Sequence, residues 1–275
     1  MPEYLKKYSK DWKINNARKI SSTATGDIYL VESDDKRAVL KILNDLGVKD
    51  ELPGSYFLKI CEGLGAARLF KFDERALLME YLPGENLYQF SKINNEKRAS
   101  EIFCEVIRKI RRPAHTIDSK RLVDYAKLFS VLEDIEIKKE MRELFECARY
   151  LVRELLKTQS EEVILHGDLH HENIISRATG EFVCFDPKGM VGDPSYELGT
   201  TLKNPWDYPE ISQNIEIFKR RAKYFSKELL LPYNRVIGFS FVHLCLSMAW
   251  ALEQGTNYEH QLKLAQKLFQ TKILG

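Results

Sequence analysis

The sequence predicts an α+β fold in which a small antiparallel sheet is followed by a larger, mainly helical part. Segments with the alternation of β-strands dominate the first part of the chain, whereas apolar residues at helical spacing dominate the later part. The 275 residues, of which 44% are hydrophobic, are enough to bury a core in one or two domains. We expect the division at the Pro83-Gly84 pair, which separates residues 1–82 from residues 83–275.

Three segments of the first part have the alternating pattern of strands. Two of them flank a polar turn of the kind that closes an antiparallel hairpin, and the third ends at the Pro-Gly pair. Alternation also places Lys41 on the same strand face as Val39 and Leu43. A lysine with such neighbours is often only an edge residue whose ammonium group reaches water. The expected strands are residues 26–31, 38–43 and 77–81, and the expected turn is residues 33–36.

In the later part, the spacing of apolar residues changes to that of helices. The most apolar stretch, residues 239–252, is shorter than the about 18 residues that a membrane-spanning helix needs, and polar residues interrupt it. We therefore expect a core helix there, and the charged N-terminus lacks the apolar region of a signal peptide. The expected helices are residues 102–110, 141–156, 215–229, 236–254 and 259–274.

Charge and cysteine content argue against several classes of partner. The formal net charge is +2 with both signs interspersed, so we expect neither a nucleic-acid nor a membrane partner. The five cysteines are scattered and form no Cys-x-x-Cys pair, which argues against a disulfide scaffold or structural zinc and favours the reducing cytoplasm. For the assembly we expect a monomer or a weak dimer.

The most informative stretch is His166-Gly167-Asp168-Leu169-His170-His171-Glu172-Asn173, which Asp186-Pro187-Lys188 follows. Residues 174–176 and 181–185 have the pattern of two strands joined by a Gly-containing turn. In such a hairpin the residue that enters the first strand lies beside the residue that leaves the second, so Asn173 and Asp186 become neighbours, with Asp168 just before them. Two hard oxygen ligands suit Mg²⁺, and a nearby unpaired carboxylate can accept a hydroxyl proton. The spacing therefore indicates phosphoryl transfer.

This pattern is similar to the catalytic loop and metal-binding Asp of the protein-kinase-like superfamily, in the small-molecule branch that carries His-Gly-Asp-Leu-His. Residues 163–173, with the Asp-Pro-Lys-Gly-Met-Val-Gly-Asp-Pro-Ser-Tyr-Glu run of residues 186–197, resemble the aminoglycoside/hydroxyurea phosphotransferases, which include the streptomycin 6-phosphotransferases. The resemblance covers roughly residues 20–200. It implies a protein-kinase-like two-lobe fold, with a small nucleotide-binding N-lobe and a larger catalytic and acceptor-binding C-lobe, and it implies ATP and Mg²⁺ as cofactors.

The resemblance also implies roles for the central residues. Asp168 orients the acceptor hydroxyl and accepts its proton, and Asn173 and Asp186 hold Mg²⁺. Lys41 then contacts the α- and β-phosphates.

A glutamate on the helix after the lysine strand usually holds this lysine. The aligned positions, residues 54–56, carry Gly-Ser-Tyr here, and Glu51 is the nearest substitute. Because Pro53-Gly54 follows so closely, we expect a regular helix to be weakened there, which leaves the pairing open.

The same resemblance implies where the rest of the nucleotide binds. The turn at residues 21–26, which includes Thr23 and Gly26, covers the phosphates, although it lacks the three glycines of a GxGxxG loop. Met79 lies behind the adenine, and the Glu80 carbonyl and the Leu82 N–H bind the adenine edge. Without the catalytic-loop motif elsewhere in the chain, residues 78–84 would be interpreted as an ordinary strand that ends at a turn.

Other polar residues near the motif have simpler interpretations. The histidines and acids of residues 166–172 would suit zinc only on a helix, and Gly167 after a buried strand indicates a loop, so we expect His166 to brace that loop and no zinc to bind. We expect Asp193 to hold the catalytic loop by accepting hydrogen bonds from backbone N–H groups. We expect Trp206, Tyr208, Trp250 and Tyr258 to be core or rim aromatics.

The acceptor is the least determined part of the prediction. The family resemblance favours a streptomycin-like aminoglycoside, a polycation whose pocket should be lined with carboxylates. Alternatives are a kinase of another hydroxyl, as in a metabolite, hydroxyurea or a protein side chain, and a nucleotide-binding pseudokinase module. The absence of Ala-Pro-Glu after Asp186 argues against a protein kinase, and retention of all four central residues argues against a pseudokinase. Candidate pocket acids are Glu197, Asp207, Glu210, Glu253 and Glu259.

Overall fold

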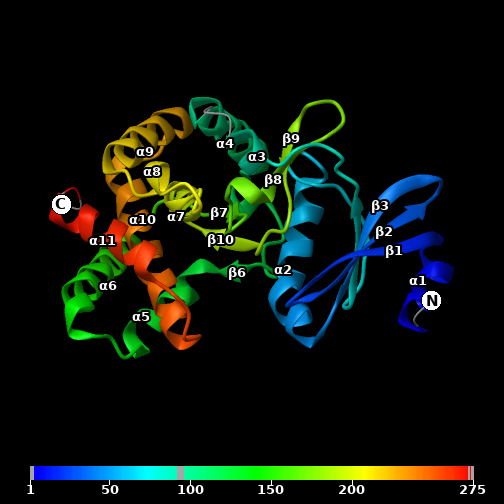
Figure 1. Cartoon of the computed structure of the whole chain (residues 1–275), viewed down its shortest axis with the longest axis horizontal. Coiled ribbons are helices and arrows are strands. Elements are labelled where there is room, and N and C mark those ends of the chain that lie inside the picture. Colours follow the sequence, from blue (N-terminus) through cyan, green and yellow to red (C-terminus); the bar gives the residue numbers. More distant parts are fainter. Residues whose placement is uncertain (1–2, 92–95, 272, 274–275) are drawn as a thin grey trace.

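The computed structural model describes residues 3–91, 96–271 and 273. A sheet-bearing part and a helical part lie side by side along the long axis, and the two termini lie at opposite ends (Figure 1). The predicted order of an antiparallel sheet followed by helices is confirmed.

The first part is built on a five-stranded antiparallel sheet with the order β1-β2-β3-β5-β4. The three predicted strands are present, and β1 and β4 are additional. Strand β1 continues to Thr23, which pairs with Gly26, so the predicted turn at residues 21–26 is reduced to the two residues between them. The strands are β1 Ile14–Thr23, β2 Gly26–Ser33, β3 Lys36–Leu43, β4 Leu69–Phe72 and β5 Ala76–Glu80.

The two faces of β3 meet different surroundings. Ala38 and Leu40 belong to a hydrophobic cluster that includes Leu5 and Tyr8 of helix α1 (Glu3–Asp11). The residues between and after them, Val39 and Lys41, point to the opposite face because side chains alternate along a strand. Lys41 therefore lies on the same strand face as Val39, as the alternation predicts.

Helix α2 (Asp45–Cys61) continues through Pro53, contrary to the expectation of a weakened helix. Proline removes one backbone hydrogen bond, but two features at the ends of α2 compensate for it. The Asn44 side chain accepts a hydrogen bond from the Gly47 N–H at 2.9 Å and caps the first turn. Phe57 and other residues of the last turns are buried in the core. Figure 1 shows α2 between the sheet and the helical part.

Helix α10 is the centre of the later part, packed between α6 and α7 and against α9 and α11. It is long and apolar enough to cross a membrane by length and composition, but 83% of its most apolar window is buried inside the protein. It therefore has the packing of the expected core helix. The main helices are α4 Glu96–Ile110, α6 Arg142–Lys157, α7 Leu198–Lys203, α9 Ile215–Leu229, α10 Tyr233–Glu253 and α11 Glu259–Gln270. The last helix was expected to reach residue 274, which, like residue 272, lies outside the described residues.

Short elements between the two parts carry the central motif. A three-stranded sheet has the order β6-β10-β7, and the strands β8 and β9 form a separate hairpin. These strands are β6 Val123–Asp124, β7 Val163–Leu165, β8 Ile174–Ser176, β9 Phe182–Cys184 and β10 Met190–Gly192. Short helices are α3 Leu87–Ser91, α5 Val131–Asp134 and α8 Pro209–Ser212, with 3-10 turns η1 Ala114–Thr116, η2 Tyr125–Ser130, η3 Lys139–Met141, η4 His171–Asn173 and η5 Pro194–Glu197.

Candidate active site

The β8–β9 hairpin brings Asn173 and Asp186 together at one of its ends. Ile174 pairs with Cys184, and the Phe185 N–H donates to the Asn173 carbonyl at 3.0 Å. The structure thus makes Asn173 and Asp186 neighbours, as the hairpin argument predicts. Asp186 has a φ of +58°, a left-handed conformation that is uncommon outside glycine. Backbone conformations of this kind cluster at active sites and ligand-binding positions.

Lys41 joins the sheet to this hairpin through two ion pairs. Its ammonium nitrogen lies 2.5 Å from Glu51 Oε2 and 2.9 Å from Asp186 Oδ1. Burial alone would lower the pKa of Lys41, but the carboxylates of Asp186 and Glu51 outweigh it and raise that pKa. Burial likewise opposes ionisation of Asp186, and Lys41 reverses this effect, so the pKa of Asp186 is lowered. Lys41 and Asp186 are therefore both charged at neutral pH.

The catalytic loop is braced from inside by His166. This side chain is fully buried, and burial lowers its pKa to about 4, so the ring is neutral. Its Nδ1 accepts a hydrogen bond from the Asp168 N–H at 3.2 Å, which leaves Nε2 to donate to the Phe185 carbonyl at 2.9 Å. His166 therefore braces the loop, as expected. The Asp168 side chain is 38% exposed, and its Oδ2 lies 4.0 Å from His170 Nε2.

Glu197, not Asp193, holds the backbone of the catalytic loop. Its two carboxylate oxygens accept hydrogen bonds from the His166 N–H at 2.7 Å and the Gly167 N–H at 3.0 Å. Burial, partly offset by these two bonds, raises the pKa of Glu197 to about 7. Asp193 instead caps the η5 turn through the Ser195 N–H at 2.8 Å and forms an ion pair with Arg235. The expectation that Asp193 holds the catalytic loop was wrong, because its hydrogen bonds go to η5 and Arg235. The expectation that Glu197 lines an acceptor pocket was also wrong, because its carboxylate binds the loop backbone.

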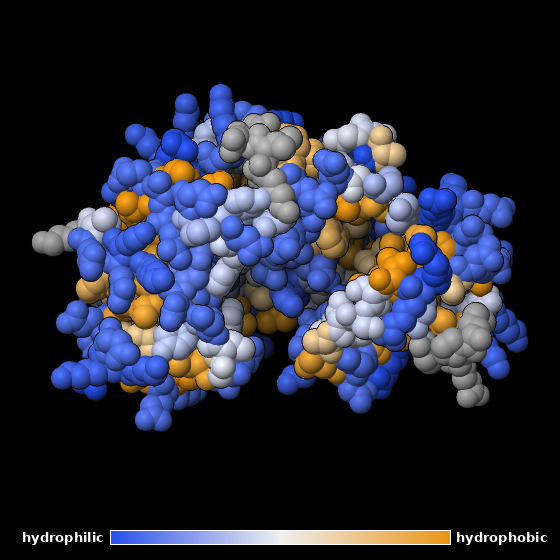
Figure 2. All heavy atoms as spheres, viewed as in Figure 1, coloured by the Kyte–Doolittle hydropathy of each residue, from blue (hydrophilic) through white to orange (hydrophobic). Residues whose placement is uncertain are grey.

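A mostly apolar cavity of about 270 Å³ lies between the sheet and the hairpin. Thr23, Lys41, Glu80, Leu82 and Asp186, all predicted from the sequence, lie together on its wall. Among the described residues, the Leu82 N–H has no hydrogen-bond partner. Figure 2 shows hydrophobic side chains around the hollow between the two parts of the molecule. The complete lining is Ile20, Thr23, Ile28, Val39, Lys41, Ala67, Met79, Glu80, Tyr81, Leu82, Ile175, Phe185 and Asp186.

Two of the predicted nucleotide-site residues, Gly26 and Glu80, also make contacts that hold the sheet and the hairpin in place. Gly26 is not among the described residues that line the cavity, and a Cβ there would lie 2.0 Å from the Ile42 carbonyl, so glycine is required for β2 to pack on β3. The Glu80 side chain is held by Arg177, whose Nε and Nη2 donate to its two oxygens at 2.8 and 2.9 Å. This bidentate pair fastens the end of β5 to the hairpin turn.

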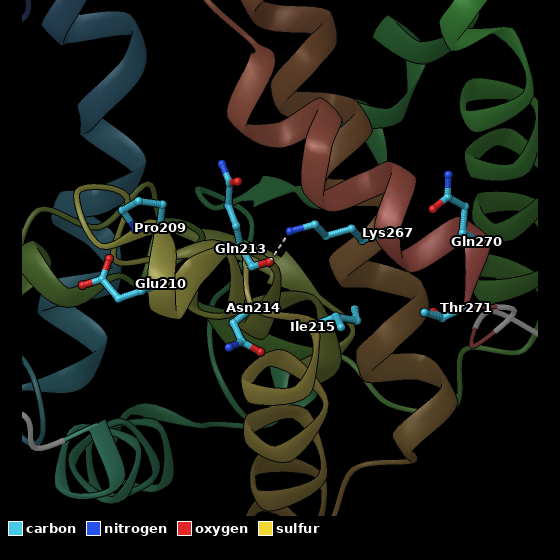
Figure 3. A pocket seen from close by; sticks show the side chains of 8 residues that line it. All are labelled: Pro209, Glu210, Gln213, Asn214, Ile215, Lys267, Gln270 and Thr271. Carbon is cyan, nitrogen blue, oxygen red and sulfur yellow. Dashed lines mark hydrogen bonds between the residues drawn. The ribbon is translucent and has the colours of Figure 1, made fainter.

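The acids expected around the acceptor do not lie together. Asp207 accepts a hydrogen bond from the Tyr88 hydroxyl at 2.6 Å, and the Tyr88 and Tyr208 rings lie 5.7 Å apart. That bond to Asp207, with burial and the nearby charges of Asp207 and Glu172, raises the pKa of Tyr88 to about 12. Asp207, Tyr88, Tyr208 and Glu172 therefore gather beside the catalytic loop. Glu210 lines a separate open hollow at α8, α9 and α11, where Lys267 donates to the Gln213 carbonyl (Figure 3).

The remaining candidates lie on the surface or in packed positions. Glu253 and Glu259 are exposed. Trp206 stacks on His260 with ring centres 4.5 Å apart, and Trp250 packs edge-on against His243 at 6.1 Å. These contacts agree with the expectation of core or rim aromatics.

The donor atoms at the hairpin end fit a hard divalent cation. Asn173 donates its Nδ2 hydrogen to the Asp168 carbonyl at 2.9 Å, so its Oδ1 remains as an oxygen ligand. Asp186 uses Oδ1 for Lys41 and keeps Oδ2. Two protein oxygens completed by phosphates and water are the coordination that Mg²⁺ prefers. No group of three or more His, Cys, Asp or Glu residues within the described ranges could hold a metal ion.

The family model of the aminoglycoside/hydroxyurea antibiotic resistance kinases matches residues 11–255. The chain belongs to this family. It is a small-molecule phosphotransferase, and the resemblance inferred from the motif is confirmed.

Curated relatives are streptomycin kinases of two kinds. A streptomycin 3''-kinase of Klebsiella pneumoniae is 28% identical over 195 residues, which are 70% of this chain and 71% of the relative. A streptomycin 6-kinase of Streptomyces griseus is 22% identical over 246 residues, which are 86% of this chain and 77% of the relative.

Solved structures of two other kinases share the fold. The aminoglycoside phosphotransferase APH(4)-Ia superposes with a TM-score of 0.66 at 12% identity, over 98% of this chain and 97% of that chain. The choline kinase LicA of Streptococcus pneumoniae gives a TM-score of 0.64 at 15% identity, over 97% of this chain and 96% of that chain. The protein-kinase-like two-lobe fold predicted for this kinase is thus confirmed.

Three of the contacts that support the site have no signal in the sequence. They are the Glu197 brace, the Arg177–Glu80 pair and a hydrogen bond of 2.7 Å from the Thr201 hydroxyl to the Leu169 carbonyl. Each joins residues far apart in the chain, and none has a local spacing that would have revealed it.

Proposed function

We propose that this kinase transfers the γ-phosphoryl group of ATP to a hydroxyl group of a streptomycin-like aminoglycoside. The observation that carries the proposal is the contact of Lys41 with both Glu51 and Asp186, together with Asn173, which binds the Asp168 carbonyl of the catalytic loop. The streptomycin kinases among the relatives support the acceptor.

The cavity between sheet and hairpin suits the nucleotide. In the proposed complex the adenine lies against Met79 and the other apolar side chains, and the Glu80 carbonyl and Leu82 N–H bind its edge. Lys41 contacts the α- and β-phosphates, and the turn with Thr23 and Gly26 lies over them. Related folds have been solved with ADP, AMP-PNP or AMP, which supports a nucleotide at this place.

Asn173 and Asp186 would hold Mg²⁺, which when bound offsets the charge of the phosphates. Glu51 holds Lys41 in the position from which it reaches the nucleotide, and the two charges remain paired because both are buried. Burial of these charges also strengthens their action on the phosphates.

Asp168 is proposed to accept the hydroxyl proton. Its carboxylate is partly exposed, and its backbone is fixed by His166 and Asn173. Because the transition state of phosphoryl transfer is loose, the carboxylate mainly orients the hydroxyl and takes its proton late.

Acidic and aromatic groups beside the catalytic loop favour a cationic acceptor. Asp207 and Glu172 supply negative charge, and the rings of Tyr88 and Tyr208 offer faces that attract cations. The names of the two kinds of relative differ in the phosphorylated position, so they support the acceptor class and leave the position to be determined.

A coupled ADP-release assay tests the proposal. Streptomycin, other aminoglycosides, hydroxyurea, choline-like amino alcohols and common sugars are compared as acceptors at equal concentration. Turnover with streptomycin supports the proposal, and its KM should rise with salt because attraction to carboxylates is screened over about 10 Å at 0.1 M ionic strength. If no aminoglycoside is phosphorylated and a neutral acceptor is, the protein remains a kinase but the aminoglycoside proposal is wrong.

A further inference from the structure

Helix α2 approaches two nucleotide-site segments through glycines. A Cβ on Gly47 would lie 2.1 Å from the Thr25 carbonyl oxygen, in the turn between β1 and β2. A Cβ on Gly54 would lie 2.0 Å from the Pro187 carbonyl oxygen, directly after Asp186. Real Cβ atoms essentially never come closer than 3.0 Å to such atoms, so no other residue fits without moving these segments.

The contact at Gly54 is reciprocal. Gly189 has a φ of +68°, and a Cβ there would lie 2.1 Å from the Pro53 carbonyl oxygen. The backbones of α2 and of residues 187–189 therefore interlock at Pro53-Gly54. The same segment donates the Lys188 N–H to the His166 carbonyl at 2.8 Å, which ties it to the catalytic loop.

Glu51 lies between the two glycine contacts on one face of α2. Residues 47, 51 and 54 are spaced i, i+4 and i+7, which places them along a single helix face. That face carries the Glu51 carboxylate to Lys41 and Asp186. Two glycines and a proline lower the stability of a helix. Their presence in α2 therefore indicates that the close backbone contacts which the glycines permit are needed.

We propose that Gly47 and Gly54 are positioning residues that set the distance between α2 and the two segments around the phosphates, and so hold Glu51 against the Lys41–Asp186 pair. The inference rests on the proposed function, because it concerns the site that binds Mg·ATP. A methyl group at Gly54 must move Pro187, and with it Asp186, by about 1 Å, from 2.0 to 3.0 Å. A misplacement of that size costs up to about 100-fold in an enzyme site.

The test compares Gly54→Ala, Gly47→Ala and a matched control, Gly238→Ala. Gly238 is also a buried helical glycine, but its added Cβ would meet only the end of the Leu155 side chain at 3.2 Å, far from α2 in the sequence. Mg·ATP binding is measured by calorimetry, and KM and kcat by ADP release, at a temperature well below the lowest Tm of the set. We expect each α2 variant to raise the Kd and KM of Mg·ATP by about 10- to 100-fold and the control to match the wild type.

A double-mutant cycle separates positioning from general destabilisation. Glu51→Gln removes the charge that the interlock is proposed to place, so Gly54→Ala should weaken binding far less in a Glu51→Gln background than in the wild type. Equal effects in the two backgrounds, or α2 variants that bind like Gly238→Ala, would overturn the interlock. If Gly54→Ala fails to fold, the same double-mutant cycle is measured with Gly47→Ala and Glu51→Gln. A wild type that binds no Mg·ATP would overturn the proposed function itself, which is a different outcome.

Discussion

Replacing Glu197 by Gln should make the stability of this kinase less dependent on pH. Glu197 is buried and its pKa is raised from an ordinary 4.5 to about 7. In the unfolded chain the carboxyl group ionises near 4.5, whereas in the folded protein it keeps its proton until about pH 7. Below pH 4.5 the protonated group contributes its full stabilisation, and that contribution is lost as the pH rises through 7.

The magnitude follows from the size of the pKa shift. A difference of about 2.5 units at 1.36 kcal/mol per unit corresponds to about 3 kcal/mol of unfolding free energy, most of it lost between pH 5 and pH 8. The side-chain amide of the Glu197→Gln variant would not titrate, so this loss would be absent. The amide nitrogen would face either the His166 or the Gly167 N–H, which adds a cost of about 1–3 kcal/mol that is the same at both pH values.

Urea unfolding of both proteins at pH 5 and pH 8 measures the effect. Wild type should be the more stable at pH 5, and its advantage over Glu197→Gln should shrink by about 2–3 kcal/mol at pH 8. All other titrating groups are common to the two proteins and cancel in the difference. A stability difference that is equal at the two pH values would refute the buried, proton-holding state of Glu197.

Other predictions concern the reacting groups. Asp168→Asn should lower phosphoryl transfer by about 10²–10⁴-fold in a steady-state assay and leave the Kd of ATP unchanged, since the carboxylate contacts the acceptor; an active variant would contradict its role. Asp186→Ala should weaken Mg²⁺-dependent nucleotide binding more than Asn173→Ala, because only Asp186 carries charge; calorimetric titrations with and without Mg²⁺ decide this. Asp207→Asn should raise the KM of a cationic acceptor and flatten its salt dependence, and unchanged kinetics would place the acceptor elsewhere.

Local spacing in the sequence was sufficient to bring several of the expected nucleotide-site residues together. The hairpin argument needed only two short strands and a turn to bring Asn173 and Asp186 together, and strand alternation was enough to turn Lys41 into the cleft. Both inferences depend on residues within one or two adjacent elements, where backbone geometry dictates direction. The fold class followed from the same kind of local periodicity.

The errors arose where tertiary contacts override local preference. Pro53-Gly54 lowers helix propensity, and reasoning from propensity alone expected α2 to weaken just after Glu51. The structure gives those residues a contact with Pro187 and Gly189, more than a hundred positions away, which no local pattern encodes. The exchange of Asp193 and Glu197 has a similar cause: Asp193 caps the η5 turn, whereas Glu197 reaches a loop 31 positions earlier in the chain, a contact that no local pattern encodes.

The residues proposed to bind the phosphates and those proposed to bind the acceptor differ in what a substitution would disturb. At the proposed phosphate end Lys41 is buried and paired with Glu51 and Asp186, and glycine contacts hold the segments beside it, so a change there affects folding and chemistry together. Asp207, which is proposed to face the acceptor, is exposed, and it meets Tyr88 from a distant segment through one hydrogen bond. Exposed residues of this kind can be exchanged at little cost to stability. A family can therefore keep one phosphate site while its acceptor contacts diverge, which agrees with relatives named for different hydroxyls of streptomycin.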